Sequence, residues 1–141
     1  MKKNTFKIIA AVAIVLLVLI LLNMQLKPVY IAGKIIFVEV ADNLNKRSQG
    51  LKGRKFLAKN KGMLFCFEKE GYPQFWMKDT LIPLDIAFIN KNKQIIDVQH
   101  MAPLDEQLRY SPKSKAIYAL EMNEGWFGSN KIGVGDKLIF K

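Results

Sequence analysis

The hydrophobic residues of the chain follow two different patterns. Residues 8–22 form one uninterrupted run of 15 apolar residues, whereas the rest of the chain alternates short apolar runs with polar breaks. A helix that packs against a globular core is apolar on one stripe only, so a run that is apolar on every face does not suit one. The pattern therefore separates a leading segment, residues 1–28, from a body, residues 29–141.

The leading segment is interpreted as an uncleaved signal anchor with an N-terminal transmembrane helix. Lys2, Lys3 and Lys7 precede the apolar run, and no small-x-small cleavage pattern follows directly after it. The positive charges favour an N-terminus in the cytoplasm. We therefore expect a single-pass protein of the cytoplasmic membrane with its body outside, in the periplasm or at the cell surface. If the leader is cleaved, the body is secreted instead.

Short apolar and β-branched runs in the body predict strands. A hairpin turn is predicted at Lys91–Lys93, between two of these runs. Pro83 cannot lie in the centre of a strand ladder and must separate two strands. The predicted strands are Lys34–Val40, Gly62–Phe67, Phe75–Met77, Asp85–Ile89, Gln94–Val98, Lys115–Met122 and Asp136–Phe140.

Helix signals are fewer. Residues 42–57 have apolar positions at helical spacing, with Asp42 or Asn43 as the N-cap and with Gly50 as a weak point. A second short helix is predicted from near Asn123 to Gly128. The fold class predicted is α+β and β-rich: a curved, mostly antiparallel sheet that can close into a small barrel, with one or two short helices.

Composition excludes several classes of protein. The chain has 22 basic and 12 acidic residues, and the excess consists mostly of scattered lysine, so no nucleic-acid partner is expected. One cysteine, Cys66, and one histidine, His100, allow neither an internal disulfide nor a Cys-rich zinc module. No metal and no cofactor are expected. A catalytic pair of Cys66 and His100 remains a minor alternative.

Several sequence blocks are individually distinctive. The most specific one, Phe75–Ile89, has the form Phe-Trp-Met-Lys-Asp-Thr-Leu-Ile-Pro-Leu-Asp-Ile-Ala-Phe-Ile. With the blocks at Arg47–Arg54, Gly62–Phe65 and Leu120–Gly125, it resembles the family of small secreted or membrane-anchored prokaryotic domains known as domain of unknown function one-ninety-two. The resemblance covers nearly the whole body and implies a compact β-rich domain with no settled activity. Asp79 stands where that family more often has Asn.

Candidate ligand-binding residues concentrate in this most specific block. On a strand, Trp76, Lys78 and Thr80 would share one face and could bind a sugar or a peptide, with Asp79 on the opposite face. The structural alternative is that Trp76 fills the core, Thr80 bonds a turn amide and Asp85 caps the strand after the proline.

Arginine and glutamate supply the remaining candidates. Arg47 or Arg54 could clamp an anionic ligand, because a guanidinium suits carboxylates and phosphates. Alternatively, one of the two arginines pairs with Asp85 or Glu121 and fixes the helix to the sheet. Glu121 lies within an apolar run and needs a partner if it is buried.

Three functions remain open from the sequence. The first is a non-catalytic ligand-binding or accessory module of the cell envelope, with a small molecule, a glycan or an envelope protein as its partner. The second is an envelope hydrolase that acts on carbohydrate through paired carboxylates, either Asp79 with Asp85 or Asp85 with Glu121. The third is a structural interaction domain that uses a sheet edge or the loop at Trp126 and Phe127.

Overall fold

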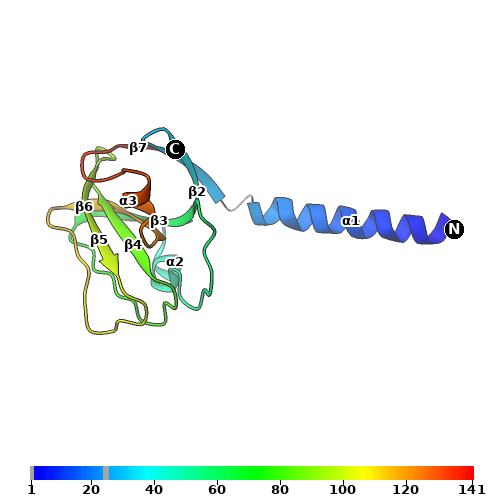
Figure 1. The fold of residues 1–141 in the computed structure, drawn as a ribbon, viewed down its shortest axis with the longest axis horizontal. Helices are drawn as coiled ribbons and strands as arrows, with labels where there is room; N and C mark the ends of the chain where they lie inside the picture. The colour runs from blue at the N-terminus through cyan, green and yellow to red at the C-terminus, as the bar shows by residue number, and fades with distance from the viewer. Residues whose placement is uncertain (1, 24–25) are drawn as a thin grey trace.

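The body of the protein is built on one curled sheet. The computed structural model describes residues 2–23 and 26–141, and its seven strands are ordered β5-β4-β6-β3-β2-β1-β7 (Figure 1). Neighbouring strands are antiparallel except for the parallel pair β2 and β3. The strands are β1 (Leu26–Ile31), β2 (Lys34–Ala41), β3 (Lys61–Gly71), β4 (Leu84–Ile89), β5 (Ile95–Met101), β6 (Ala116–Asn123) and β7 (Leu138–Ile139).

The two ends of the sheet approach each other, which gives the curl its half-barrel form. An isolated antiparallel bridge joins Gln94 to Lys137, and the Ile95 amide donates to the Asp136 carbonyl at 2.9 Å. The start of β5 therefore lies beside β7, although these strands stand at opposite ends of the strand order. The predicted α+β class with a curved, mostly antiparallel sheet is confirmed.

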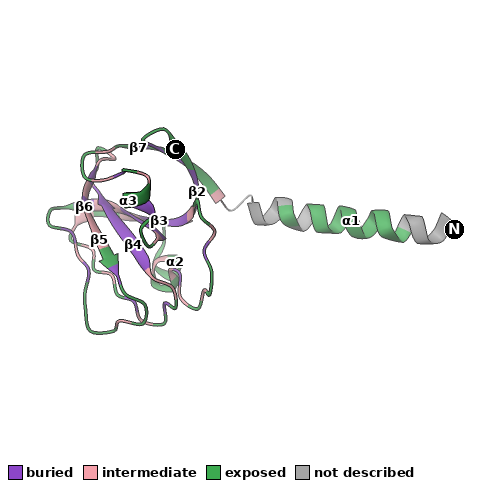
Figure 2. Ribbon diagram, in the orientation of Figure 1, coloured by how far each residue is buried: buried purple, intermediate pink, exposed green. Residues whose placement is uncertain are grey.

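Both faces of the central strands are buried. The inner, concave face packs around helix α3 (Trp126–Ser129), whose Trp126 and Phe127 are buried. Strand β4 is coloured as buried along its length in Figure 2. The outer face carries a second apolar cluster that includes Phe65 and Ile86. Every residue of β4 is buried because alternate side chains enter the two clusters. Both rings of α3, Trp126 and Phe127, belong to the core, which is the arrangement the sequence favoured, so the alternative of a protein-binding loop at these two residues is not supported.

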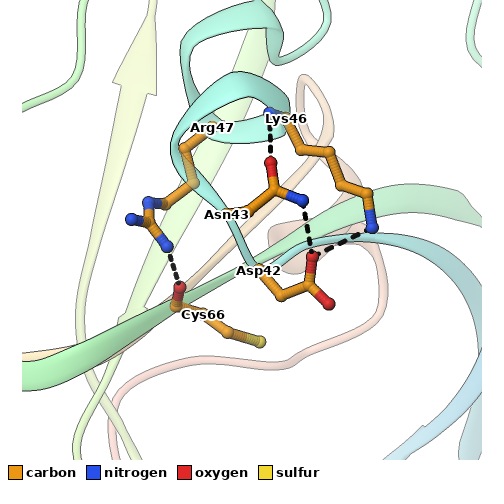
Figure 3. Close-up of polar contacts among 5 residues, drawn as sticks. All are labelled: Asp42, Asn43, Lys46, Arg47 and Cys66. Atoms are coloured by element: carbon orange, nitrogen blue, oxygen red, sulfur yellow. Dashed lines mark hydrogen bonds and ion pairs between the residues drawn. The ribbon is translucent and has the colours of Figure 1, made fainter.

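Helix α2 (Leu44–Gln49) lies over the outer face. Its N-cap is Asn43, whose side chain accepts a hydrogen bond from the Lys46 amide at 3.0 Å (Figure 3). The helix ends at Gly50, whose positive φ of +50° glycine adopts more readily than any residue with a side chain. The predicted cap is correct, but the predicted helix over residues 42–57 is too long because Gly50 stops it.

The structure differs from the predicted local structure at three further places. Residues 75–77 do not form a strand: Phe75 makes only an isolated bridge to Tyr110 before the chain turns at Asp79, where φ is +59°. Strand β1 was not among the predicted strands, and its backbone pairs with both β2 and β7. The short second helix exists but begins at Trp126 rather than near Asn123.

Helix α1 (Lys2–Asn23) precedes the sheet. Within the described part of the chain, no helix combines the length and the hydrophobicity that crossing a membrane requires. The predicted transmembrane helix therefore stays a prediction. The described apolar side chains of α1 are 49–64% exposed and contribute to neither core; they are Ile8, Ile9, Val12, Ile14, Val15, Leu16 and Leu19.

Gly62 provides a test of the packing between β3 and β6. It lies opposite Met122, and a Cβ atom at this position would collide with the Glu121 carbonyl oxygen and the Met122 sulfur. We expect Gly62→Ala to lower the free energy of unfolding by about 1–3 kcal/mol, because the backbone must shift to admit the methyl group. Gly71→Ala, in the same strand but with open space around it, is the matched control. Equal urea midpoints for the two variants of the full chain would contradict this packing.

Candidate functional site

A cavity of about 300 Å³ lies between helix α2, the segment that precedes β4 and the outer face of the sheet. Its volume is within the range of small-molecule sites. Aromatic rings form much of its wall, and charged side chains reach it from α2 with the turn that follows it and from β6. The lining residues discussed below are Arg47, Lys52, Phe65, Phe67, Phe75, Trp76, Thr80 and Glu121.

Arg47 reaches the cavity from helix α2. Its Nη1 donates a hydrogen bond to the Cys66 carbonyl at 2.9 Å (Figure 3). Its Cζ lies 5.3 Å from the centroid of the Phe67 ring. These contacts hold the guanidinium against β3. Among the described residues, no carboxylate forms an ion pair with Arg47. The arginine therefore brings an uncompensated positive charge to the wall.

Trp76 is surrounded by cations. Its indole is 40% exposed, and the Arg109 Cζ lies 4.7 Å from the ring centroid. The Nζ atoms of Lys78 and Lys52 lie 5.5 Å and 5.7 Å from it. All three are within the distance at which a cation is attracted to an aromatic face. Three positive charges therefore lie beside Trp76, and one of them, Lys52, lines the cavity with it.

Glu121 lies at the sheet side of the cavity. In register it stands between Met63 of β3 and Ile86 of β4, and only 5% of its surface is exposed. Burial raises the pKa of its carboxyl group to about 8, because the charged form is poorly solvated there. A protonated carboxyl can donate a hydrogen bond to a molecule in the cavity.

The predicted partner of Glu121 is wrong. Among the described residues, the carboxyl group of Glu121 forms no ion pair and no hydrogen bond. Arg54 instead donates hydrogen bonds to both carboxylate oxygens of Glu39, each at 2.6 Å. Arg54 does not line the cavity. The expected Arg–Glu pair therefore exists in the domain as Arg54 with Glu39. Glu121 is not part of it and lines the cavity instead.

Asp85 has a structural role on the other face of the sheet. It accepts a hydrogen bond from the Gly125 amide at 2.8 Å and contacts Nδ1 of His100 at 3.2 Å. In register it pairs with Met122, the neighbour of Glu121, so Asp85 and Glu121 point to opposite faces. These two carboxylates cannot flank one glycosidic bond, which removes one of the two predicted catalytic pairs.

The remaining candidates divide between the cavity wall and the turn beside it. Thr80, which is 5% exposed, lines the cavity. Lys78 lies over the ring of Trp76 but does not line the cavity. Asp79 lies in the turn, where its carbonyl accepts a hydrogen bond from the Gly53 amide at 2.9 Å, and its carboxylate is not part of the wall. The predicted common strand face for Trp76, Lys78 and Thr80 is wrong because this segment is a turn.

Cysteine and histidine do not form the alternative catalytic pair. His100 contacts Asp85 and, at 3.6 Å, Glu124. Cys66 lies in β3 opposite Tyr118, and burial raises the pKa of its thiol, which disfavours the reactive thiolate. In the described ranges, no group of three His, Cys, Asp or Glu side chains could hold a metal ion.

Sequence reasoning missed three contributors to this site: Lys52, Phe67 and Arg109. In the sequence, Lys52 is one of many scattered lysines, and Arg109 lies in a long segment without a recognisable motif. The bridge between Phe75 and Tyr110 and the backbone hydrogen bonds of Met77 to Asp105 and of Leu104 to Thr80 bring that segment to the one that contains Trp76. No local sequence pattern reports such a contact.

The ionisation of Glu121 gives a pH-dependent stability. Because its pKa rises from 4.5 in the unfolded chain to about 8 in the fold, the folded state holds a proton that the unfolded state loses as pH rises between these values. We expect the free energy of unfolding to fall by about 1 kcal/mol per pH unit in this window from this group alone. Glu121→Gln should abolish that part of the decline, so its melting temperature should exceed the wild type most clearly near pH 8.

Glu68→Gln, at an exposed glutamate of β3 that has no ion pair among the described residues, is the control and should leave this decline in place. Parallel profiles for Glu121→Gln and wild type would mean that Glu121 is ionised normally in the fold.

Comparison with known proteins identifies relatives of the whole body. A protein of unknown function from Novosphingobium aromaticivorans DSM 12444 is 28% identical, with a TM-score of 0.77 over 82% of this chain and 85% of that one. A protein from Sinorhizobium meliloti 1021, described as a candidate transcription regulator, is 29% identical, with a TM-score of 0.77 over 82% and 93% of the two chains. No curated protein matches. The model of the family DUF192, uncharacterized ACR, matches residues 28–140, so the chain belongs to this family.

Proposed function

We propose that this chain is a membrane-attached, extracytoplasmic module that binds a small anionic ligand in the cavity beneath helix α2. The observation that carries this proposal is Glu121, a buried carboxyl group that faces the cavity without an ion pair among the described residues. Burial of such a group costs free energy, and carboxyl groups with strongly raised pKa values cluster at functional sites. A ligand that accepts a hydrogen bond from the carboxyl would recover part of that free energy.

The charges around the cavity indicate the class of ligand. Arg47 and Lys52 line it with positive charge, while the raised pKa of Glu121 keeps that carboxyl largely neutral at pH 7. A carboxylate or a phosphate of the ligand would bind the guanidinium through charge-assisted hydrogen bonds. The rings of Phe67 and Trp76 offer an apolar surface on which a sugar or another flat body could stack. A carboxylated envelope sugar combines both features.

Binding accounts for the site better than hydrolysis does. Glycoside hydrolysis generally requires two carboxyl groups on either side of the scissile bond. Glu121 lines the cavity, whereas Asp85 lies on the opposite face and Asp79 lies outside the wall. One carboxyl with cations around it suits recognition of an anion.

Membrane attachment is proposed from the leading segment. Its uninterrupted apolar run from Ile8 to Leu22 follows three lysines, in the order that holds an N-terminus in the cytoplasm. The apolar side chains described on α1 are exposed and have no core to enter. Lipid would cover them, and the domain would then lie on the outer side of the membrane.

The ligand proposal is tested with two sugars that share a ring but differ in charge. N-acetylmuramic acid carries a carboxylate and N-acetylglucosamine does not. We expect the first to change the fluorescence of Trp76 and the second to bind about tenfold more weakly or not at all, because it lacks the anion for Arg47. Titration of the full chain in detergent, with Trp76→Phe to identify the responding indole, measures this.

Two arginines serve as a matched pair in the same titration. Arg47→Gln should weaken binding of the carboxylated sugar about tenfold or more, since it removes a charged donor from the wall. Arg54→Gln, whose native partner Glu39 lies outside the cavity, should leave the affinity unchanged. The proposed site would be wrong if the two variants bound equally well.

Attachment to the membrane is tested on the full chain in cells. We expect it to remain with the membrane fraction after carbonate extraction, and a C-terminal alkaline phosphatase fusion to be active. Leu16→Arg should weaken insertion, because an arginine at the centre of a lipid-embedded helix costs about 3 kcal/mol. Release of the wild-type chain by carbonate, or an inactive fusion beside an active cytoplasmic reporter fusion, would disprove the attachment or its orientation.

A further inference from the structure

An uncovered apolar surface lies on the outer side of strands β1, β2 and β7. We call it the exposed sheet face and define it by Tyr30, Ile35, Phe37 and Ile139, which are 48%, 49%, 46% and 68% exposed. Register joins its members: Tyr30 stands opposite Ile35 on one side and opposite Ile139 on the other. The four side chains therefore form one continuous surface and are not scattered loop residues.

The sheet is apolar on both faces here, although only one face is covered. Val29, Ile31, Ile36 and Val38 alternate with the exposed residues and are buried in the inner cluster. Farther along the sheet, over β3, β6 and β4, the outer face packs into the second apolar cluster. A half-exposed antiparallel sheet normally places polar residues outward. A continuous exposed apolar patch marks an interaction surface.

Basic side chains surround this face. Lys61 stands opposite Phe37 in register, and the exposed Lys137 and Lys141 flank Ile139 on the same side of β7. Glu39, two residues after Phe37 in β2, has both carboxylate oxygens bound by Arg54. The exposed sheet face thus combines apolar side chains with lysines at its border. It is complementary to a partner whose apolar interior lies beneath negatively charged groups.

We propose that the exposed sheet face docks onto the anionic headgroups of the bilayer that carries the anchor. Strand β1 begins at Leu26, only three residues after α1 ends at Asn23, so this edge of the sheet is the part of the body tied closest to the leading segment (Figure 1). Lysines near an anionic membrane surface and partly inserted Tyr and Phe side chains both favour such contact. The inference rests on the proposed membrane attachment and adds which side of the domain meets the lipid.

A fluorophore at two equally exposed positions tests the docking. In a Cys66→Ala background, the full chain carries bimane on Ile139→Cys or on Leu108→Cys, whose native side chains are 68% and 57% exposed. Position 139, in β7, lies beside the start of β5. Position 108 belongs to the loop that follows the end of β5, so the two labels are at opposite ends of this strand. The chain is reconstituted in vesicles of phosphatidylcholine with about 30% phosphatidylglycerol and a lipid spin-labelled near its headgroup.

We expect the spin-labelled lipid to quench the label at position 139 at least about twofold more than the label at position 108, and less so in vesicles without phosphatidylglycerol. Equal quenching in a chain that floats with the vesicles overturns the docking and leaves the attachment standing. A chain that fails to float overturns both. Protection of position 139 from iodide without lipid quenching means that a second copy or another protein covers the face, which also overturns the proposal.

Discussion

The structure depends on burial of the central strands on both of their faces. Strand β4 has no exposed residue, because its alternate side chains enter an inner cluster around helix α3 and an outer cluster beneath helix α2. Such a strand leaves no solvated face on which a polar residue can be placed without cost. Every charged group on β4 or on the adjoining strand β6 therefore needs a partner or a function.

Two carboxylates meet this requirement in different ways. Asp85 lies on the inner face, where the Gly125 amide and His100 satisfy it and tie β4 to the turn that leads into α3. Glu121 lies on the outer face, where the surrounding rings and helix α2 leave a cavity in front of it. The same two-sided burial thus produces one structural carboxylate and one whose function has to be sought in the cavity.

Features set by neighbouring residues were predictable from the sequence, and features set by register were not. The cap at Asn43 and the turn after Asn90 follow from short-range chemistry, and both are found. The strand at Asp85 was predicted, but pairing with β6 decides which face its side chain joins, and a shift of one residue reverses that face. Glu121 was recognised as an acid within an apolar run that would need a partner if buried, yet Arg54 binds Glu39 and no arginine pairs with Glu121 among the described residues. Arg109 could not be foreseen, since a long loop brings it to the indole.

The central claim is that Glu121 holds its proton at neutral pH because the fold removes water from it. Carboxyl carbon-13 NMR of the full chain, labelled at glutamate and assigned by loss of one resonance in Glu121→Gln, measures this directly. The account predicts a resonance that titrates with a midpoint near pH 8. A midpoint near the ordinary value of 4.5 would show that water or a cation reaches the carboxylate, and the argument for the cavity as an anion site would fail.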